Sequence, residues 1–240
     1  GDEGDPGSYI DKHLMEWSPE LLLEGMALAG YAVGAANGFV YVRSEYPLSK
    51  PALEAAVGRA YAAGDLGHDI YGSGFSFHVH VEEGAGSYVV GEETALLNSL
   101  QGMRGTVSAR PPFPAEKGYH ALPTVVNNVE TLCNAPFIAL HGAEAYGALS
   151  PGATPGTKLV CLNERFRNPG AYEVELGVGL RYVFEELGGG LRDGHVLRSL
   201  QVGGPLGGFI GPEHLDLPLA FDALRAAGAD LGHGSLVAID

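Results

Sequence analysis

Apolar residues along the first 140 positions switch repeatedly between a helical spacing and a strand-like alternation. Ser18-Pro19-Glu20 opens the first predicted helix, because serine suits the cap and proline suits the first helical position. The predicted order is a helix over 18–34, a strand over 39–43, a helix over 51–63 capped by Ser49 and ended by Gly64, an alternating strand over 75–81, a helix over 92–100 and a helix over 127–141 that Pro136 should kink or break.

This alternation predicts an α/β fold. Strands separated by helices of this length are joined by right-handed crossovers and lie in a mainly parallel sheet. A Pro/Gly-rich connector at 150–156 then marks a domain boundary. Beyond it, short strands are predicted at 158–162, 171–174, 197–202 and 236–239, around one helix at 180–187. We therefore expect two domains, residues 1–150 and residues 157–240.

Composition and charge exclude several classes of protein. Hydrophobic residues make up 45% of the chain and charged residues 18%, as in a globular protein rather than a disordered one. No apolar run approaches the roughly 20 residues that a membrane helix needs. The best candidate, 21–36, is interrupted by Glu24 and by glycines. The net charge of -15 disfavours nucleic acid and anionic lipid as partners, so we expect neither nucleic-acid binding nor direct membrane insertion.

The cysteines and histidines bear on location and on metal chemistry. Cys133 and Cys161 do not make a disulfide framework, which suits a reducing cytosol and predicts a cytoplasmic protein. Neither lies in a Cys-x-x-Cys spacing, so we expect no iron–sulfur cluster within these residues. His78 and His80 have a spacing that can bind zinc, but the polar face of a strand also explains them. We expect no metal site.

The most informative segment is 84–97. Its first glycines let the backbone approach a ligand, Tyr88 offers a flat ring, and Glu92 and Glu93 open a helical run. A strand, a glycine turn and a helix N-terminus commonly hold an anionic or planar cofactor. The pattern also has a purely structural explanation, because many such turns bind nothing and the two carboxylates complement a helix dipole.

Several segments together, in their order along the chain, resemble one family of flavoproteins. They are 1–7, with Asp5 where a Glu is more usual, 23–26, 41–46, 84–97, 110–114 and 123–131. The family is that of the NADH-oxidising flavoprotein subunits. It includes the flavoprotein subunit of respiratory complex I and the diaphorase subunits of NAD-linked formate dehydrogenases and hydrogenases.

The resemblance implies FMN and NADH as ligands, held by a Rossmann-like flavin-binding domain that a small β-grasp (ubiquitin-like) domain follows. Hydride would pass directly between two stacked rings, so no catalytic side chain is expected. The residues implied for FMN are Asp2, Glu3, Tyr88, Gly91, Glu92, Glu93, Asn127, Asn128 and Thr131, and those implied for NADH are Asp5, Glu93, Arg110 and Phe113.

Some of these assignments have structural alternatives. Phe113 lies among prolines and can instead fill a core. Asn127 and Asn128 can be ordinary helix caps, and Arg110 can be a solvated surface residue. Carboxylates beside the ribose would accept its hydroxyl hydrogen bonds and oppose a 2′-phosphate, which predicts NADH rather than NADPH.

The resemblance also implies partners and further parts. A thioredoxin-like [2Fe-2S] subunit and further iron–sulfur subunits would receive the electrons, and through them the chain could lie on the cytoplasmic face of a membrane. A phosphate-binding glycine loop should precede Gly1 and a domain with a [4Fe-4S] cluster should follow Asp240, so we expect an internal fragment. The final electron acceptor stays open between quinone, protons and CO2.

Three functions compete on the sequence alone. The first is an oxidoreductase module that takes hydride from NADH. The second is a scaffold subunit that keeps the fold without turnover, which Asp5, Val90 and the turn at 119–122 leave open because they depart from the family pattern. The third is a ligand-binding module based on the second domain alone. The loop at 203–208 is a weak pointer to the formate-dehydrogenase branch, and could pack on the first domain or face a partner.

Overall fold

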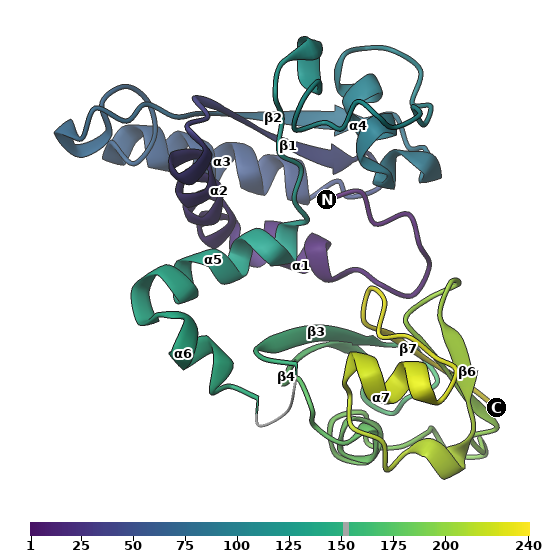
Figure 1. Ribbon diagram of the computed structural model, residues 1–240. Coiled ribbons are helices and arrows are strands. Elements are labelled where there is room, and N and C mark those ends of the chain that lie inside the picture. Colours follow the sequence, from purple (N-terminus) through teal and green to yellow (C-terminus); the bar gives the residue numbers. More distant parts are fainter. Residues whose placement is uncertain (151–153) are drawn as a thin grey trace. The chain divides into compact units, whose positions relative to one another are not determined.

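The computed structural model describes residues 1–150 and 154–240 (Figure 1). The chain forms two compact units. Unit 1 contains Gly1–Gly4 and Asp11–Pro136, and unit 2 contains Asp5–Ile10 and Phe137–Asp240. Three residues of the Pro/Gly-rich connector, 151–153, lie outside the described residues. The domain limits 1–150 and 157–240 stay a prediction.

Unit 1 contains two parallel strands covered by helices. Strands β1 and β2 pair in parallel from Asn37↔His78 to Arg43↔Gly84, and helices α2 and α3 pack against each other and against the strands (Figure 1). This confirms the mixed α/β fold, with parallel pairing across a helical crossover. The elements are α1 (Ile10–Trp17, which begins in unit 2), α2 (Pro19–Val33), β1 (Asn37–Arg43), α3 (Ser49–Ala63), β2 (His78–Gly84), α4 (Glu93–Leu100) and α5 (Val129–His141, which continues into unit 2).

The sequence predicted the C-terminal ends of helices α2 and α3 more accurately than their N-terminal caps. Gly34 and Gly64 end α2 and α3 in the left-handed conformation, with φ of 72° and 83°, which glycine adopts without steric cost. The predicted cap at Ser49 is wrong, because α3 begins at Ser49 itself and its hydroxyl donates to Glu16 Oε1 at 3.1 Å. Ser18 stands at the start of α2 without a capping hydrogen bond from its side chain.

Strand β2 begins three residues later than predicted. Phe77 instead makes an isolated antiparallel bridge with Gly67, in which each N–H donates to the other's carbonyl at 2.9 Å. The Phe77 ring lies where Gly30 and Gly38 have no side chain, since a Cβ at either position would come within 2.7 Å of the ring. A tertiary contact therefore sets the strand boundary.

Helix α5 continues through Pro136, so of the predicted kink or break the break is wrong. Proline has no N–H, which leaves the carbonyl of Leu132 without its usual donor one turn ahead. That carbonyl faces Gly25 of α2, where a Cβ would lie only 2.0 Å from the oxygen. Such close approach brings a glycine Cα within weak hydrogen-bonding range of the free carbonyl. The Gly25–Leu132 contact thus compensates in part for the proline.

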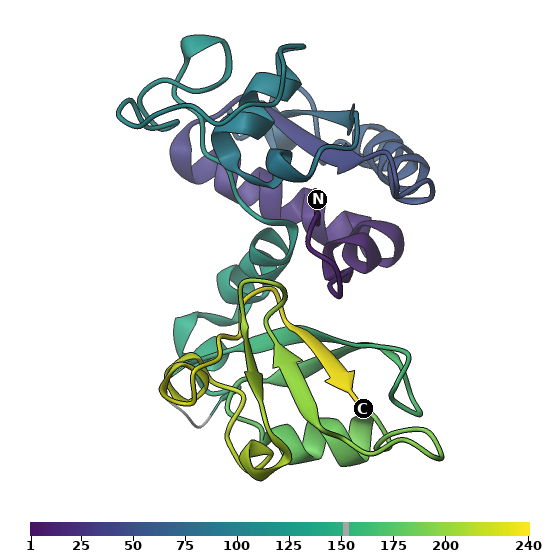
Figure 2. The same ribbon diagram turned by 90° about the vertical axis from the view of Figure 1, so that its right-hand side faces the viewer.

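Unit 2 is built on a five-stranded mixed sheet (Figure 2). The strand order is β4-β3-β7-β5-β6, with β3 and β7 parallel and the other neighbours antiparallel. Leu180 and Val183 pack with the inner side chains of the strands in one core. The elements are α6 (Ala143–Gly147), β3 (Thr157–Leu162), β4 (Gly170–Glu175), a π-helical turn (Tyr182–Leu187), β5 (Ser199–Val202), β6 (Gly208–Ile210), α7 (Phe221–Ala226) and β7 (Ser235–Ile239).

Four predicted strands and the predicted helix of this unit are present, although the helix is a π-helical turn. The sequence pattern missed α1, α6, α7 and β6.

The glycines between β5 and β6 allow close packing within unit 2. A Cβ on Gly203 would lie 2.2 Å from the carbonyl oxygen of Asp230, and one on Gly204 would lie 2.0 Å from His233. In the described part of the chain, no helix is long and apolar enough to cross a membrane.

Candidate functional site

Glu92 caps helix α4. Its Oε2 accepts hydrogen bonds from Thr94 N at 2.9 Å, from Ala95 N at 3.1 Å and from the Thr94 hydroxyl at 2.5 Å. Burial raises the pKa of Glu92, but these bonds and one from Arg110 outweigh it, so the pKa lies below its ordinary value. The glutamate is therefore a firmly ionised cap at the positive end of α4.

Arg110 lies between the two carboxylates at this helix start. Its guanidinium donates to Glu92 Oε1 and lies 3.1 Å from Glu93 Oε1. These three groups together carry one net negative charge. Arg110 is an exposed residue that pairs with both carboxylates, so any anion that binds it must compete with Glu92 and Glu93.

The acidic loop at the start of the chain contacts the glycine turn before α4. The ring of Tyr88 packs against Gly4, where a Cβ would lie 2.9 Å from the ring, and 62% of Tyr88 stays exposed. A Cβ on Gly91 would meet only the carbonyl oxygen of Asp2, at an ordinary 3.4 Å. The protein itself therefore leaves room for a side chain at Gly91.

Asp2 and Glu3 differ in how their carboxylates are satisfied. Glu3 Oε2 accepts from Lys12 N at 3.1 Å and from the Tyr46 hydroxyl at 3.0 Å. Asp2 Oδ2 is buried and has no hydrogen-bond partner among the described residues. Burial raises the pKa of Asp2, against the opposing effect of Arg43. Asp2 thus has an unused acceptor in its buried carboxylate, while its carbonyl oxygen lies next to Gly91.

The start of helix α5 carries the amide residues of the candidate site. Asn128 caps the helix, since its Oδ1 accepts from Glu130 N at 2.8 Å. Its Nδ2 donates to Asp11 Oδ2 at 2.7 Å, and Asp11 is 1% exposed. Asn127 and Thr131 are exposed. The sequence pattern did not indicate Asp11 as a site residue. An acidic residue in the first turn of a helix is the only signal it gives, and this helix was not predicted.

Asp5 belongs to unit 2. Its Oδ2 lies 3.8 Å from His233 Nε2. The other candidate site residues, Asp2, Glu3, Tyr88, Gly91, Glu92, Glu93, Arg110, Phe113, Asn127, Asn128 and Thr131, all lie in unit 1.

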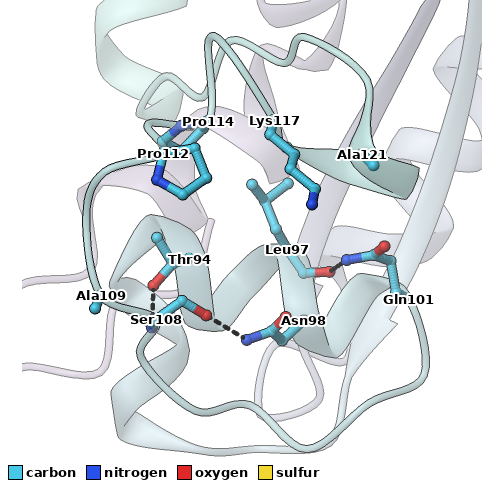
Figure 3. A pocket seen from close by; sticks show the side chains of 11 residues that line it. Thr94, Leu97, Asn98, Gln101, Ser108, Ala109, Pro112, Pro114, Lys117 and Ala121 are labelled. Atoms are coloured by element: carbon cyan, nitrogen blue, oxygen red, sulfur yellow. Dashed lines mark hydrogen bonds between the residues drawn. The ribbon is translucent and has the colours of Figure 1, made fainter.

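Phe113 lies on a loop that α4 holds in place. Its ring is 51% exposed, so it does not fill a core. The neighbouring Pro112 and Pro114 line a cavity of about 290 Å³, into which the Lys117 side chain points (Figure 3). Polar side chains of α4 and of Gln101, which follows it directly, hold this loop. Thr94 Oγ1 accepts from Ser108 N at 2.9 Å, Asn98 Nδ2 donates to Thr106 O at 2.7 Å, and Gln101 Oε1 accepts from His120 N at 3.0 Å.

The end of that loop is strained. His120 and Ala121 have φ of 48° and 62°, a left-handed conformation that glycine adopts at lower cost. This is the turn at 119–122, which lacks the family's usual glycine. His78 and His80 have protein contacts, to the Tyr61 hydroxyl at 3.2 Å and to Asn37 Oδ1 at 3.4 Å.

Comparison with known families identifies the first part of the chain. Residues 1–136 match the model of the Nuo51 FMN-binding domain. The chain belongs to this family.

Relatives of this Nuo51-family chain match it over its whole length. It is 44% identical over 239 residues to an NADH-quinone oxidoreductase subunit of Escherichia coli (strain K12), and the match covers 100% of the chain and 54% of that protein. It is 42% identical to the NADP-reducing hydrogenase subunit HndC of Solidesulfovibrio fructosivorans, covering 49% of it. The chain thus spans about half the length of these relatives.

A solved structure with the same fold supports the assignment to the Nuo51 family. The crystal structure of an NAD+-reducing [NiFe]-hydrogenase in the H2-reduced state matches 100% of the chain and 39% of its own chain, with a TM-score of 0.86 and 37% sequence identity. The open side of Gly91 and the exposed Tyr88 ring fit a flat ligand such as FMN, and the same acidic loop has an unused acceptor in Asp2 Oδ2.

Proposed function

We propose that the chain is the FMN- and NADH-binding part of an NADH-oxidising flavoprotein subunit. Bound FMN would accept a hydride from NADH and release electrons one at a time to iron–sulfur clusters of partner subunits. The observation that carries the proposal is the meeting of the acidic loop with the glycine turn. There the carbonyl oxygen of Asp2 lies beside a glycine whose Cβ the protein could accommodate, and the Asp2 carboxylate has a buried, unused acceptor.

The chain's own residues would bind and orient the two rings. The proposed FMN residues are Asp2, Glu3, Tyr88, Gly91, Glu92, Glu93, Asn127, Asn128 and Thr131, and the proposed NADH residues are Asp5, Glu93, Arg110 and Phe113. The exposed rings of Tyr88 and Phe113 offer flat surfaces for stacking. The excess of carboxylates favours the oxidised, cationic nicotinamide over the neutral reduced form. No side chain is proposed as an acid or base.

We infer that residues 157–240 form a β-grasp domain. Numbered within the domain, the strands have the order 2-1-5-3-4, with the first and last strands parallel and a helical turn between the second and third. This order supports an ubiquitin-like architecture. Its glycine loop at 203–208 packs on its own unit, while Leu206 within that loop is 89% exposed.

The partners would be iron–sulfur subunits, among them a thioredoxin-like [2Fe-2S] subunit, on the cytoplasmic side. The names of the relatives support the presence of partner subunits, since they denote subunits of an NADH-quinone oxidoreductase and of a hydrogenase. The final acceptor would be set by those subunits.

The proposed function is tested with the full natural chain, stripped of flavin and reloaded with FMN. We expect FMN-dependent reduction of ferricyanide by NADH, with flavin absorbance bleached by NADH in the absence of oxygen. A reloaded protein whose flavin NADH does not bleach would favour the non-catalytic scaffold instead.

Gly91→Ala should weaken FMN binding while leaving the stability of the flavin-free protein nearly unchanged. A Cβ at this position meets only Asp2 O at 3.4 Å, so the free energy of unfolding of the flavin-free protein should change by less than about 0.5 kcal/mol. The same methyl group would occupy space that the flavin needs, and the Kd for FMN should rise at least about tenfold. Fluorescence titration and thermal melting of the same preparation check both. An unchanged Kd would move the flavin away from Gly91.

NADH should be preferred over NADPH by at least about tenfold in kcat/KM, or roughly 1.4 kcal/mol, because the net negative charge of Glu92, Glu93 and Arg110 repels a 2′-phosphate. Ferricyanide reduction with each nucleotide measures the ratio. Equal efficiencies would mean that Arg110 leaves its carboxylates to pair with the phosphate.

A further inference from the structure

The first turn of helix α1 connects the two parts of the proposed flavin site. On one side, Glu3 of the acidic loop accepts from the backbone N–H of Lys12 at 3.1 Å. On the other side, the adjacent Asp11 accepts from Asn128 Nδ2 at 2.7 Å and from Glu130 N at 3.3 Å. Two neighbouring residues of one turn therefore fix both the acidic loop and the start of α5.

We propose that Asp11 is a positioning residue of the flavin site, whose buried carboxylate sets where Asn127, Asn128 and the free N–H groups of α5 meet the flavin. The inference rests on the proposed function. Its geometric basis is that one carboxylate satisfies two donors of the same helix end, so the Asn128 amide is held from both sides, by Asp11 and by Glu130 N. Asp11 acts through Asn128 and does not itself touch the ligand.

The need for a carboxylate follows from counting acceptors. Asp11 uses Oδ1 for Glu130 N and Oδ2 for the Asn128 amide. Asparagine has one acceptor oxygen and would turn an NH2 group toward one of these donors. Asp11→Asn therefore keeps the size of the side chain, removes the charge and loses one of the two bonds.

Burial and charge make this carboxylate sensitive to pH. Burial, Glu3 and Glu130 together raise the pKa of Asp11 to about 6, against the opposing effects of the Gly1 amino group and the hydrogen bond from Asn128. Tyr46 and Cys133 are further titratable groups whose ionised forms interact with Asp11. Protonation below this pKa removes an acceptor, as the asparagine substitution does.

The experiment compares the Kd for FMN of the wild-type full natural chain, Asp11→Asn and a control, Asn134→Ala, from pH 5 to pH 8. Asn134 lies on the same helix, where its Nδ2 donates to Glu130 O at 3.0 Å. We expect the ratio of the Asp11→Asn Kd to the wild-type Kd to be about ten at pH 8 and to approach one near pH 5. The phosphate of FMN titrates in both proteins and cancels in this ratio. The control should show no such pH dependence.

A ratio near one throughout, or a ratio that does not change with pH, would overturn the positioning role. Wild-type protein that binds no FMN at any pH would instead overturn the proposed function, and this inference with it. If thermal melting shows that Asp11→Asn does not fold, riboflavin binding by the wild type takes its place. This probe lacks a phosphate, so its affinity should weaken below about pH 6, and a flat profile would refute the inference.

Discussion

Gly25→Ala is expected to lower the free energy of unfolding by about 3 kcal/mol and the melting temperature by about 10 °C. The added Cβ would lie 2.0 Å from the carbonyl oxygen of Leu132, which is backbone inside a helix and has little freedom to move. Helices α2 and α5 would have to separate, which opens the core of unit 1. Thermal melting followed by circular dichroism measures the change.

The matched control is Gly58→Ala. Gly58 lies inside helix α3, and a Cβ there meets no atom of the described residues within 4 Å. Alanine should therefore stabilise the protein by roughly 0.5–1 kcal/mol, through its higher helix propensity. Opposite signs for the two substitutions support the close α2–α5 contact, whereas a stabilising Gly25→Ala would contradict it.

The stability of Asp11→Asn relative to wild type should increase as the pH rises, by about 2 kcal/mol between pH 4 and pH 6.5. Burial raises the pKa of Asp11 to about 6 in the folded protein, above the ordinary value of 3.8. Within this window the Asp11 carboxyl binds more protons in the folded protein than in the unfolded one, so its contribution to wild-type stability falls as the pH rises. The neutral amide has no such loss.

Denaturant unfolding of both proteins across this pH range gives the difference directly. Carboxylates with lowered pKa values, such as Glu92 and Glu45, contribute equally to both proteins and cancel. Asn134→Ala alters no ionisable group and should differ from wild type by a constant amount. A difference between Asp11→Asn and wild type that stays constant with pH would contradict a raised pKa at Asp11.

Local signals in the sequence were enough to predict most of the elements. Glycines 34 and 64 end helices because the left-handed conformation is cheap for glycine alone, and this depends on no tertiary contact. The boundaries that were wrong depend on distant partners. The Ser49 hydroxyl donates to Glu16 rather than capping its own helix. Phe77 lies outside β2 because it pairs with Gly67.

The candidate site could be predicted in its residue types but not in its pairings. Glu92 and Glu93 were recognised at a helix start. Arg110, which neutralises one charge there, lies 18 residues after Glu92, on a loop that follows α4 and whose path the sequence does not specify. The sequence could not identify Asp11 as a candidate site residue, because a single acidic residue at the start of a short helix is common. Only its burial against Asn128 distinguishes it.

The most direct test of the central claim is mass spectrometry of the cofactor released from the purified full natural chain. We expect FMN at one equivalent per chain. Gly91→Ala protein, purified in the same way, should carry much less FMN while melting at the wild-type flavin-free temperature. Recovery of stoichiometric FAD, or of no flavin from protein that was supplied with FMN, would contradict the assignment of this chain as an FMN-binding module.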